Sequence, residues 1–450
     1  MLCPHGIRLQ YLNSNENTGF IHSFYLISVN KKEEKPVSNL KLLCKILRLK
    51  GIKITRFWFK NRDKELHLVV KPHKNGCRCP ECGRRCRIVR HAPSLRRWED
   101  LTLMGMKIIF WYAPKEIQCP THGVAQETIP WAPTYSRITY RLEWRICALC
   151  QIMTQKAAAE ILKMAPSTLS DLLHRIINRV RDGHKIRGLK TVGVDEISYC
   201  KGRKFATIVY DLDRARVLWV GKGKGRETID RFFNDFLSKG QKARIRWASC
   251  DMSQAYIGAI KHHCPNASLV IDRFHLVKAL NEAVDEVRKE EWRTLDTDGR
   301  KAIKGLRWLL AMRSDSRTKG NTRFLNDLRN SNRRIHRAWV LKDEFEHFWN
   351  YSYRGSAEKF IKGWMTTALK SRIPSLRKFV NTLRNHLDHV LTFIDRNLTN
   401  AVGEGLNRVI KIVKNRASGY RGLDNFADMI YLTIGDLDIP AQIPSNLRTL

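Results

Sequence analysis

Acidic residues at the ends of two apolar segments are the first residues of this sequence whose positions suggest chemistry. Asp195 ends the run TVGVD and Asp251 ends the run WASCD, and both runs are typical of buried strands. Two carboxylates that converge near neutral pH repel each other unless a cation lies between them. Oxygen ligands select Mg²⁺ or Mn²⁺, so the pattern predicts a divalent-cation site at Asp195 and Asp251. Glu196 is expected to point to the opposite face of its strand.

A third acid from a late helix would complete a site for two metal ions. Glu404 in NAVGEGLNRVIKIVKN is the best candidate, and Asn407 and Lys411 follow it three and seven residues later. Those offsets share one helix face, so Asn407 and Lys411 are predicted to contact a bound phosphate chain. An acid in the first turn also favours the helix dipole, and this common role stays open for Glu404.

Asp272 in VIDRFHLVK competes with Asp251 for the second acidic position. It ends a further apolar segment, and His275 follows it three residues later. Asp272 could be a metal ligand, a neighbour of the metal site or a structural partner of Arg273. The expected strand order favours Asp251.

The charge of the chain indicates its class of partner. Its 450 residues contain 82 Lys and Arg against 43 Asp and Glu, a formal net charge of +39. Such an excess implies a polyanion, with nucleic acid the first choice and an anionic membrane surface a distant second. Asn407 and Lys411 are therefore predicted to bind DNA. Neither a membrane-spanning helix nor a signal peptide is predicted.

Cysteine and histidine residues form two knuckles of the same form, CPECG and CPTHG. Two knuckles with two ligands each have the spacing of a zinc ribbon, which a tetrahedral Zn²⁺ closes. The predicted ligands are Cys79, Cys82, Cys119 and His122. Cys77 and Cys86 could substitute for one of them, and ordinary reduced cysteines in a loop are the alternative.

A basic segment lies between the two knuckles. Its residues Arg96, Arg97 and Trp98 suit phosphate contact and stacking, and they are predicted to bind DNA. A solvated basic hairpin is the ordinary alternative.

Residues 137–182 fit a helix-turn-helix, although a purely structural helical hairpin has the same form. The first helix would pack through its apolar residues, and KMAP would form the turn. Ser167 would cap the second helix, whose polar face would read bases in the major groove. The apolar residues expected to pack are Ala157, Ala158, Ile161, Leu162, Leu169, Leu172 and Leu173. Cys147 and Cys150 are expected to be core residues and not a second metal site.

From residue 190 the elements follow the order strand, strand, strand, helix, strand, helix, strand, which is that of a ribonuclease H-like fold. Long basic helices follow, in which Trp292, Trp308 and Trp364 are expected mainly to pack in the core, with stacking on a flipped base as the alternative. The fold class is therefore multidomain α/β. The predicted divisions are a variable lead (1–40), a zinc-ribbon DNA-binding region (41–130), a helix-turn-helix (137–182), a ribonuclease H-like catalytic domain (190–272 and 400–435), an all-helical insertion (273–399) and a tail (436–450).

Over about residues 75 to 435 the sequence resembles bacterial insertion-sequence transposases of the ISL-three family, within the DDE superfamily. The resemblance rests on the two knuckles, the helix-turn-helix, VGVDE, GLRWLL, DMSQAYIGAIKHHCPNASLVIDRFHLVK and LTNAVGEGLNRVIKIVKNRASGYRG. Two departures are His122, where a cysteine often stands, and the unpatterned first 40 residues.

The resemblance implies that the amino-terminal modules bind the terminal inverted repeats of the element. It implies that Asp195, Asp251 and Glu404 carry Mg²⁺-dependent DNA cleavage and strand transfer. Double-stranded DNA of the element ends and of the target would be the partner. A homo-oligomer on DNA and a cytoplasmic, nucleoid-associated location are also expected. The alternatives are a DNA-binding regulator with an inert catalytic domain and a nuclease without strand transfer.

Overall fold

The structure is a computed structural model that describes residues 39–72, 77–183, 186–200, 202, 204–396 and 401–439. Most of the predicted lead at 1–40 and of the predicted tail at 436–450 lies outside these residues. The chain divides into two compact units. One consists of Met1–Lys60, Leu66–Arg96 and Phe110–Pro130, and the other of Asn61–Glu65, Arg97–Ile109 and Trp131–Leu450.

The amino-terminal part of the chain contains two small sheets and helix α1 (Asn39–Ile46). The first sheet has the order β1-β2-β5-β4, and the second has the order β3-β6-β7. Their strands are β1 (Ile52–Lys60), β2 (Glu65–Pro72), β3 (Arg87–His91), β4 (Arg96–Glu99), β5 (Lys107–Tyr112), β6 (Lys115–Cys119) and β7 (Gly123–Gln126).

Three helices follow, α2 (Tyr140–Ile152), α3 (Gln155–Ile161) and α4 (Pro166–Gly183). The expected burial of Cys147 and Cys150 in α2 is confirmed. Two details of the prediction were wrong. Ile161 ends α3 with 52% of its surface exposed, and α4 already begins at Pro166, so Ser167 lies inside its first turn. Proline suits the first helical position because its ring fixes φ and its missing N–H has no partner there.

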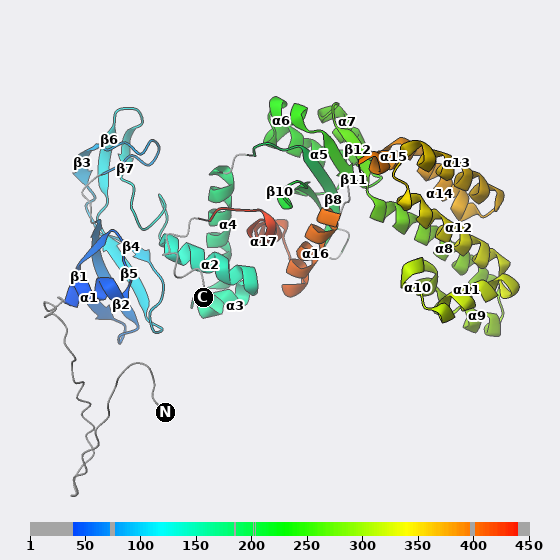
Figure 1. The fold of residues 1–450 in the computed structure, drawn as a ribbon. Helices are drawn as coiled ribbons and strands as arrows, with labels where there is room; N and C mark the ends of the chain where they lie inside the picture. Colours follow the sequence, from blue (N-terminus) through cyan, green and yellow to red (C-terminus); the bar gives the residue numbers. More distant parts are fainter. Residues whose placement is uncertain are drawn as a thin grey trace, which may run out of the picture. The chain divides into compact units, whose positions relative to one another are not determined.

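A five-stranded sheet with the order β10-β9-β8-β11-β12 forms the centre of the second unit (Figure 1). Strands β8, β9 and β10 pair antiparallel, whereas β11 runs parallel to both β8 and β12. The strands are β8 (Thr191–Cys200), β9 (Lys204–Asp211), β10 (Arg216–Lys222), β11 (Trp247–Cys250) and β12 (Ser268–Ile271). Between them lie α5 (Arg226–Arg231), a π-helical turn (Phe232–Phe236), α6 (Lys239–Arg244) and α7 (Gln254–His263). The predicted order of strands and helices is present.

Alternation along β8 supplies both faces of this sheet with core residues. Val192 and Val194 belong to one hydrophobic cluster, and Ile197 and Tyr199 belong to another. Because successive side chains of a strand point to opposite faces, the sheet lies between two cores. Asp195 therefore shares the face of Ile197 and Tyr199.

Helices make up the chain between β12 and its last described residues. They are α8 (Arg273–Thr294), α9 (Thr297–Ile303), α10 (Leu306–Ala311), α11 (Lys319–Ser331), α12 (Arg333–Glu346), α13 (Arg354–Lys370), α14 (Pro374–Asn385), α15 (Leu387–Arg396), α16 (Ala401–Arg416) and α17 (Leu423–Ile434). Trp364 is buried and Trp292 packs partly against the core, as expected. Trp308 is 74% exposed, so the expectation of core packing was wrong for this residue. Within the described ranges, no helix combines the length and the apolar character that crossing a membrane requires.

Candidate active site and metal centre

The three aspartates occupy equivalent positions on three neighbouring parallel strands. Cys250 of β11 lies in register with Val194 of β8 and with Ile271 of β12. Asp195, Asp251 and Asp272 are the residues that follow these three. Because the strands run parallel, all three carboxyl groups emerge at the same edge of the sheet.

Helix α16 lies beside β8 (Figure 1). Its residue Asn407 contacts Asp195. Its residues Leu406, Ile410 and Val413 recur at helical spacing and are buried in the cluster that also contains Ile197 and Tyr199. This packing fixes the helix on the face of the sheet that carries Asp195. The Nζ of Lys414 also donates to the carbonyl of Ser198, at 2.5 Å.

Asn407 of α16 links Asp195 to a buried tyrosine. Its Nδ2 donates to Oδ2 of Asp195 at 2.5 Å, and its Oδ1 accepts from the Tyr210 hydroxyl at 2.5 Å. The other carboxylate oxygen of Asp195 accepts from the backbone N–H of Glu196 at 2.7 Å. Asn407 was predicted to bind DNA, whereas the structure places its side chain against Asp195. The contact with Tyr210 was not predicted, and these residues are too far apart in the sequence for a local pattern to reveal it.

Asp272 and Asp251 differ in how their oxygens are engaged. Asp272 is 4% exposed and caps α8, since its Oδ1 accepts from the Phe274 N–H at 2.9 Å. Its Oδ2 lies 2.9 Å from Nδ1 of His275. Asp251 is half-buried, and its Oδ1 accepts from the Ser253 N–H at 3.0 Å. Both oxygens of Asp272 therefore have partners, and Asp251 is the more accessible acid.

The acids influence one another's protonation. Burial is the largest cause that raises the pKa of Asp195 above its ordinary value, and the nearby Asp272 carboxylate adds to it. Burial followed by Asp272 likewise raises the pKa of Glu404, which lies in the first turn of α16. Carboxylate oxygens are ligands that a hard divalent ion prefers. Among the described residues, however, only Cys79, Cys82, Cys119 and His122 have ligand atoms gathered closely enough to hold a metal ion, so a cation at the acids belongs to the proposal below.

His275 was noted in the sequence only by its spacing, and the structure places it among the acids. Burial opposes protonation of its ring, but the hydrogen bond to Asp272 and the charge of Asp195 outweigh burial and raise its pKa. The His275 ring is therefore protonated more readily than an ordinary histidine.

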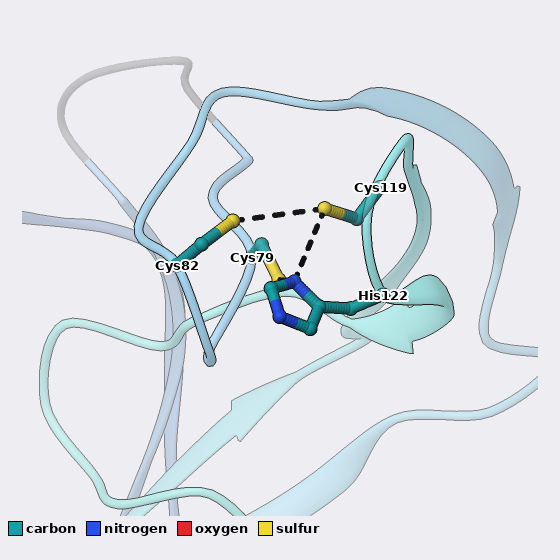
Figure 2. Close-up of side chains that lie close together, drawn as sticks. All are labelled: Cys79, Cys82, Cys119 and His122. Atoms are coloured by element: carbon teal, nitrogen blue, oxygen red, sulfur yellow. Dashed lines mark hydrogen bonds between the residues drawn. The ribbon is translucent and has the colours of Figure 1, made fainter.

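The four predicted zinc ligands converge in the first unit (Figure 2). Their ligand atoms all lie within 4.8 Å of one another. The Sγ atoms of Cys82 and Cys119 are 3.6 Å apart, and Nδ1 of His122 lies 3.7 Å from the Sγ of Cys79 and 3.6 Å from that of Cys119. Tetrahedral coordination with ordinary zinc bond lengths separates ligand atoms by about 3.5–3.8 Å. The geometry therefore fits one tetrahedral Zn²⁺.

Turn geometry and electrostatics favour the same four ligands. Gly83 and Gly123 follow the knuckles with φ of 68° and 73°, a left-handed conformation that glycine adopts without strain. The Thr121 N–H and the His122 side chain lower the pKa of the Cys119 thiol to about 6, against the effect of burial. Burial and the Glu127 carboxyl instead raise the pKa of Cys77 to about 11. Cys77 and Cys86 lie outside the group of four.

The residues predicted to bind DNA near the ribbon have different surroundings. Trp98 is 2% exposed, and its indole N–H donates to the Ser136 carbonyl at 2.8 Å. Its ring packs edge-on against Trp131, so the structure gives Trp98 a core position and no surface for stacking. Arg96 donates to the Gln126 side chain at 2.6 Å, and Arg97 is exposed. Lys411 on α16 is also exposed.

Comparisons with known proteins agree with this arrangement. Residues 192–430 match a family described as "Transposase", and residues 127–177 match the helix-turn-helix domain of transposase family ISL3. The second match covers α2, α3 and most of α4, and it assigns a DNA-binding module to these helices. The match described as "Transposase" covers the five-stranded sheet from Val192 onward and all of the candidate acids on the sheet and on α16.

Individual relatives carry the same description. The transposase for insertion sequence element IS1001 of Bordetella parapertussis is 31% identical over 398 residues, which are 87% of this chain and 95% of the relative. The transposase for IS1557 of Mycobacterium tuberculosis is 25% identical over 79% of this chain and 85% of the relative. A Drosophila P element transposase strand transfer complex aligns with a TM-score of 0.38 at 10% identity over 66% of this chain and 92% of that chain, too weak a similarity to carry an argument. The chain belongs to the ISL3 (ISL-three) family of insertion-sequence transposases.

Proposed function

We propose that this transposase cuts and joins DNA strands with divalent cations held by Asp195, Asp251 and Glu404, in a ribonuclease H-like domain split by the helical insertion at 273–399. The observation that carries the proposal is the register of β8, β11 and β12, which brings acids to one edge of the sheet next to α16. Each copy would hold one DNA end, and pairing two ends of an element requires a homo-oligomer.

Bound Mg²⁺ or Mn²⁺ would lower the pKa of an attacking water and stabilise the leaving oxygen of a phosphodiester. The chain's own contribution is orientation. Asn407 and the Glu196 N–H each fix one oxygen of Asp195, so the carboxylate keeps one direction. In cleavage, a water oxygen bonds to phosphorus, the bond to the 3′-oxygen breaks, and that oxygen takes up a proton. In joining, the 3′-hydroxyl replaces water as the nucleophile.

We assign the second acidic position to Asp251 and not to Asp272. Asp272 is 4% exposed and caps α8, whereas Asp195 and Asp251 are half-buried and therefore more accessible to a cation. Asp272 instead begins α8 and holds His275. Its proposed role is to position the helix and the histidine beside the metal site.

DNA recognition is proposed for the amino-terminal modules. The second helix of a helix-turn-helix lies in the major groove, and in α4 the side chains of Ser167, Thr168 and Asp171 are exposed. Arg97 of the ribbon region and Lys411 of α16 are proposed to contact phosphates. Trp98 is buried and Asn407 contacts Asp195, so neither residue is proposed as a DNA contact.

A metal-rescue experiment tests the assignment of the acids. Asp251→Cys should abolish strand cleavage in Mg²⁺ and regain part of it in Mn²⁺, because Mn²⁺ accepts a thiolate more readily than Mg²⁺ does. Asp272→Cys, the matched control, should show the same residual activity in either ion. Rescue of Asp272→Cys alone would move the second acidic position to Asp272. Specific end binding by a wild-type chain that cuts nothing would instead favour a DNA-binding regulator.

A further inference from the structure

A basic pocket lies in the helical segment, at the end of α8 and the turn that precedes α10. Its volume is ≈ 360 Å³. Its lining consists of Arg288, Lys289, Trp292, Arg293, Lys304 and Gly305. Four of the six lining residues are cationic and none is acidic. The pocket is separate from the acids and from the zinc ligands described above.

Two cations of the pocket, Arg288 and Lys289, have an acidic partner, whereas the other two, Arg293 and Lys304, form no ion pair within the described ranges. Asp285 is 9% exposed and forms ion pairs with Arg288 at 2.8 Å and with Lys289 at 3.2 Å. Arg293 and Lys304 are exposed, and within the described ranges no ion pair is recorded for either. The rim of the pocket therefore carries positive charge that the protein itself does not neutralise.

The two uncharged residues of the lining are Trp292 and Gly305. Trp292 packs partly against the main hydrophobic cluster, and its carbonyl accepts from Nε of Arg300 at 3.1 Å. Gly305 has a φ of 86°, and a side chain added there would meet no atom within 4 Å. The turn at Gly305 is thus uncrowded, and Trp292 adds an aromatic ring to the lining.

We propose that this pocket binds the phosphate backbone of duplex DNA away from the point of cleavage. Arginine and lysine are the side chains that contact DNA phosphates most often. A chain with a net charge of +39 has few acidic segments to offer such a pocket, which disfavours a second copy as its occupant. An acidic segment of another protein is the competing occupant.

The length of α8 sets the distance between the pocket and the proposed catalytic site. Asp272 caps the beginning of α8, and Trp292 lies near its end. At about 1.5 Å per residue, roughly 29 Å of helix separates them. A straight duplex spans that distance in about eight to nine base pairs, given about 3.4 Å for each step. Trp292 is therefore too far from the acids to stack on a base at the scissile bond, and the pocket would contact flanking duplex.

The dependence of DNA binding on salt tests this site. The full-length chain with both Arg293→Ala and Lys304→Ala is compared with the wild type on a duplex of several helical turns. The matched control carries Arg377→Ala and Lys378→Ala, which remove two exposed cations of α14. Each phosphate contact contributes about 0.9 to the slope of log K against log salt. The pocket variant should lose about one to two units of slope, and the control should keep the wild-type slope.

Two results would overturn the proposal. One is a wild-type slope in the pocket variant, and the other is an equal loss of slope in both variants. In the first case, an acidic protein partner or solvent occupies the pocket. In the second, the cations act only through net charge.

The position of the pocket relative to the point of cleavage rests on the proposed function, but the binding of DNA phosphates in the pocket does not. Binding is measured without divalent cations, and cleavage is measured separately in Mg²⁺. A reduced slope in the pocket variant together with a wild-type chain that cuts no DNA would support the DNA contact and reject the proposed catalysis. A wild-type salt slope in the pocket variant, together with normal cleavage by the wild-type chain, would reject the DNA contact at the pocket and leave the proposed catalysis in place.

Discussion

At the scale of single residues, the orientation of Asp195 depends on residues that are remote in the sequence. The amide of Asn407 lies between the Asp195 carboxylate and the hydroxyl of Tyr210, with 2.5 Å on each side. Tyr210 is buried, so its hydroxyl fixes which end of the Asn407 amide faces the acid. The role of Asn407 is therefore to position a proposed metal ligand.

Asn407→Ala should lower the rate of strand cleavage at saturating DNA by about 10- to 100-fold, as for other residues that orient a metal ligand. DNA affinity should stay at the wild-type value, because the side chain faces Asp195. Tyr210→Phe should give a smaller loss of rate in the same direction. Single-turnover rates and binding isotherms separate the two effects. Lost affinity with normal cleavage would restore the DNA-binding role that the sequence suggested.

The raised pKa of Asp195 predicts a gain in stability when its charge is removed. The folded chain binds this proton more tightly than the unfolded chain does, so the carboxyl lowers the free energy of unfolding as pH rises through the interval between the two pKa values. Without divalent cations, Asp195→Asn should raise the free energy of unfolding at neutral pH by about 1 kcal/mol. Below the ordinary aspartate pKa, the free energies of unfolding of the wild type and of Asp195→Asn should become equal. Denaturant titrations at both pH values measure these free energies. An Asp195→Asn chain that is less stable than the wild type at neutral pH would contradict the raised pKa of Asp195.

At the scale of elements, helix α16 and the zinc ribbon were accessible from the sequence for physical reasons. The offsets between Glu404, Asn407 and Lys411 predicted a late helix, and α16 spans Ala401–Arg416. The two knuckles repeat one spacing, and four ligand atoms come together there.

Other elements carried no such signal. Helix α17 has consecutive buried residues from Asp428 to Leu432, so no single apolar face marks it in the sequence. The contact between Asp195 and Asn407 joins residues 212 positions apart, and only the packing of α16 on the sheet creates it. Trp98 lies in the four-residue strand β4 after two consecutive arginines, so no alternation marks it as an inward-pointing residue.

The ribbon should bind one zinc ion per chain. Cys82→Ser should lose the ion and, with it, specific binding to the element ends, because the binding free energy of a structural zinc ion contributes directly to folding of its site. Cys86→Ser is the matched control, since its thiol contacts the Arg84 carbonyl and lies outside the group of four. Metal content by atomic absorption checks both chains. Zinc retained by Cys82→Ser and lost from Cys86→Ser would change the assigned ligand set.

At the scale of the whole molecule, charge is divided between two tasks. A net charge of +39 attracts DNA, while the acids at one edge of the β8–β11–β12 sheet form the proposed site for the cations that cut it. The family assignment covers both the helix-turn-helix and the segment with the acids. We propose that Asp195 is the first ligand of the cation site on which cleavage depends.

The most direct test of this claim maps DNA ends after incubation with the element's own ends and Mg²⁺. The wild-type chain should produce strands with new 3′-hydroxyl ends at fixed positions, followed by joined products. Asp195→Ala should bind the same ends with unchanged affinity and produce neither cut nor joined strands. Cleavage by Asp195→Ala at the wild-type rate and positions would contradict the account.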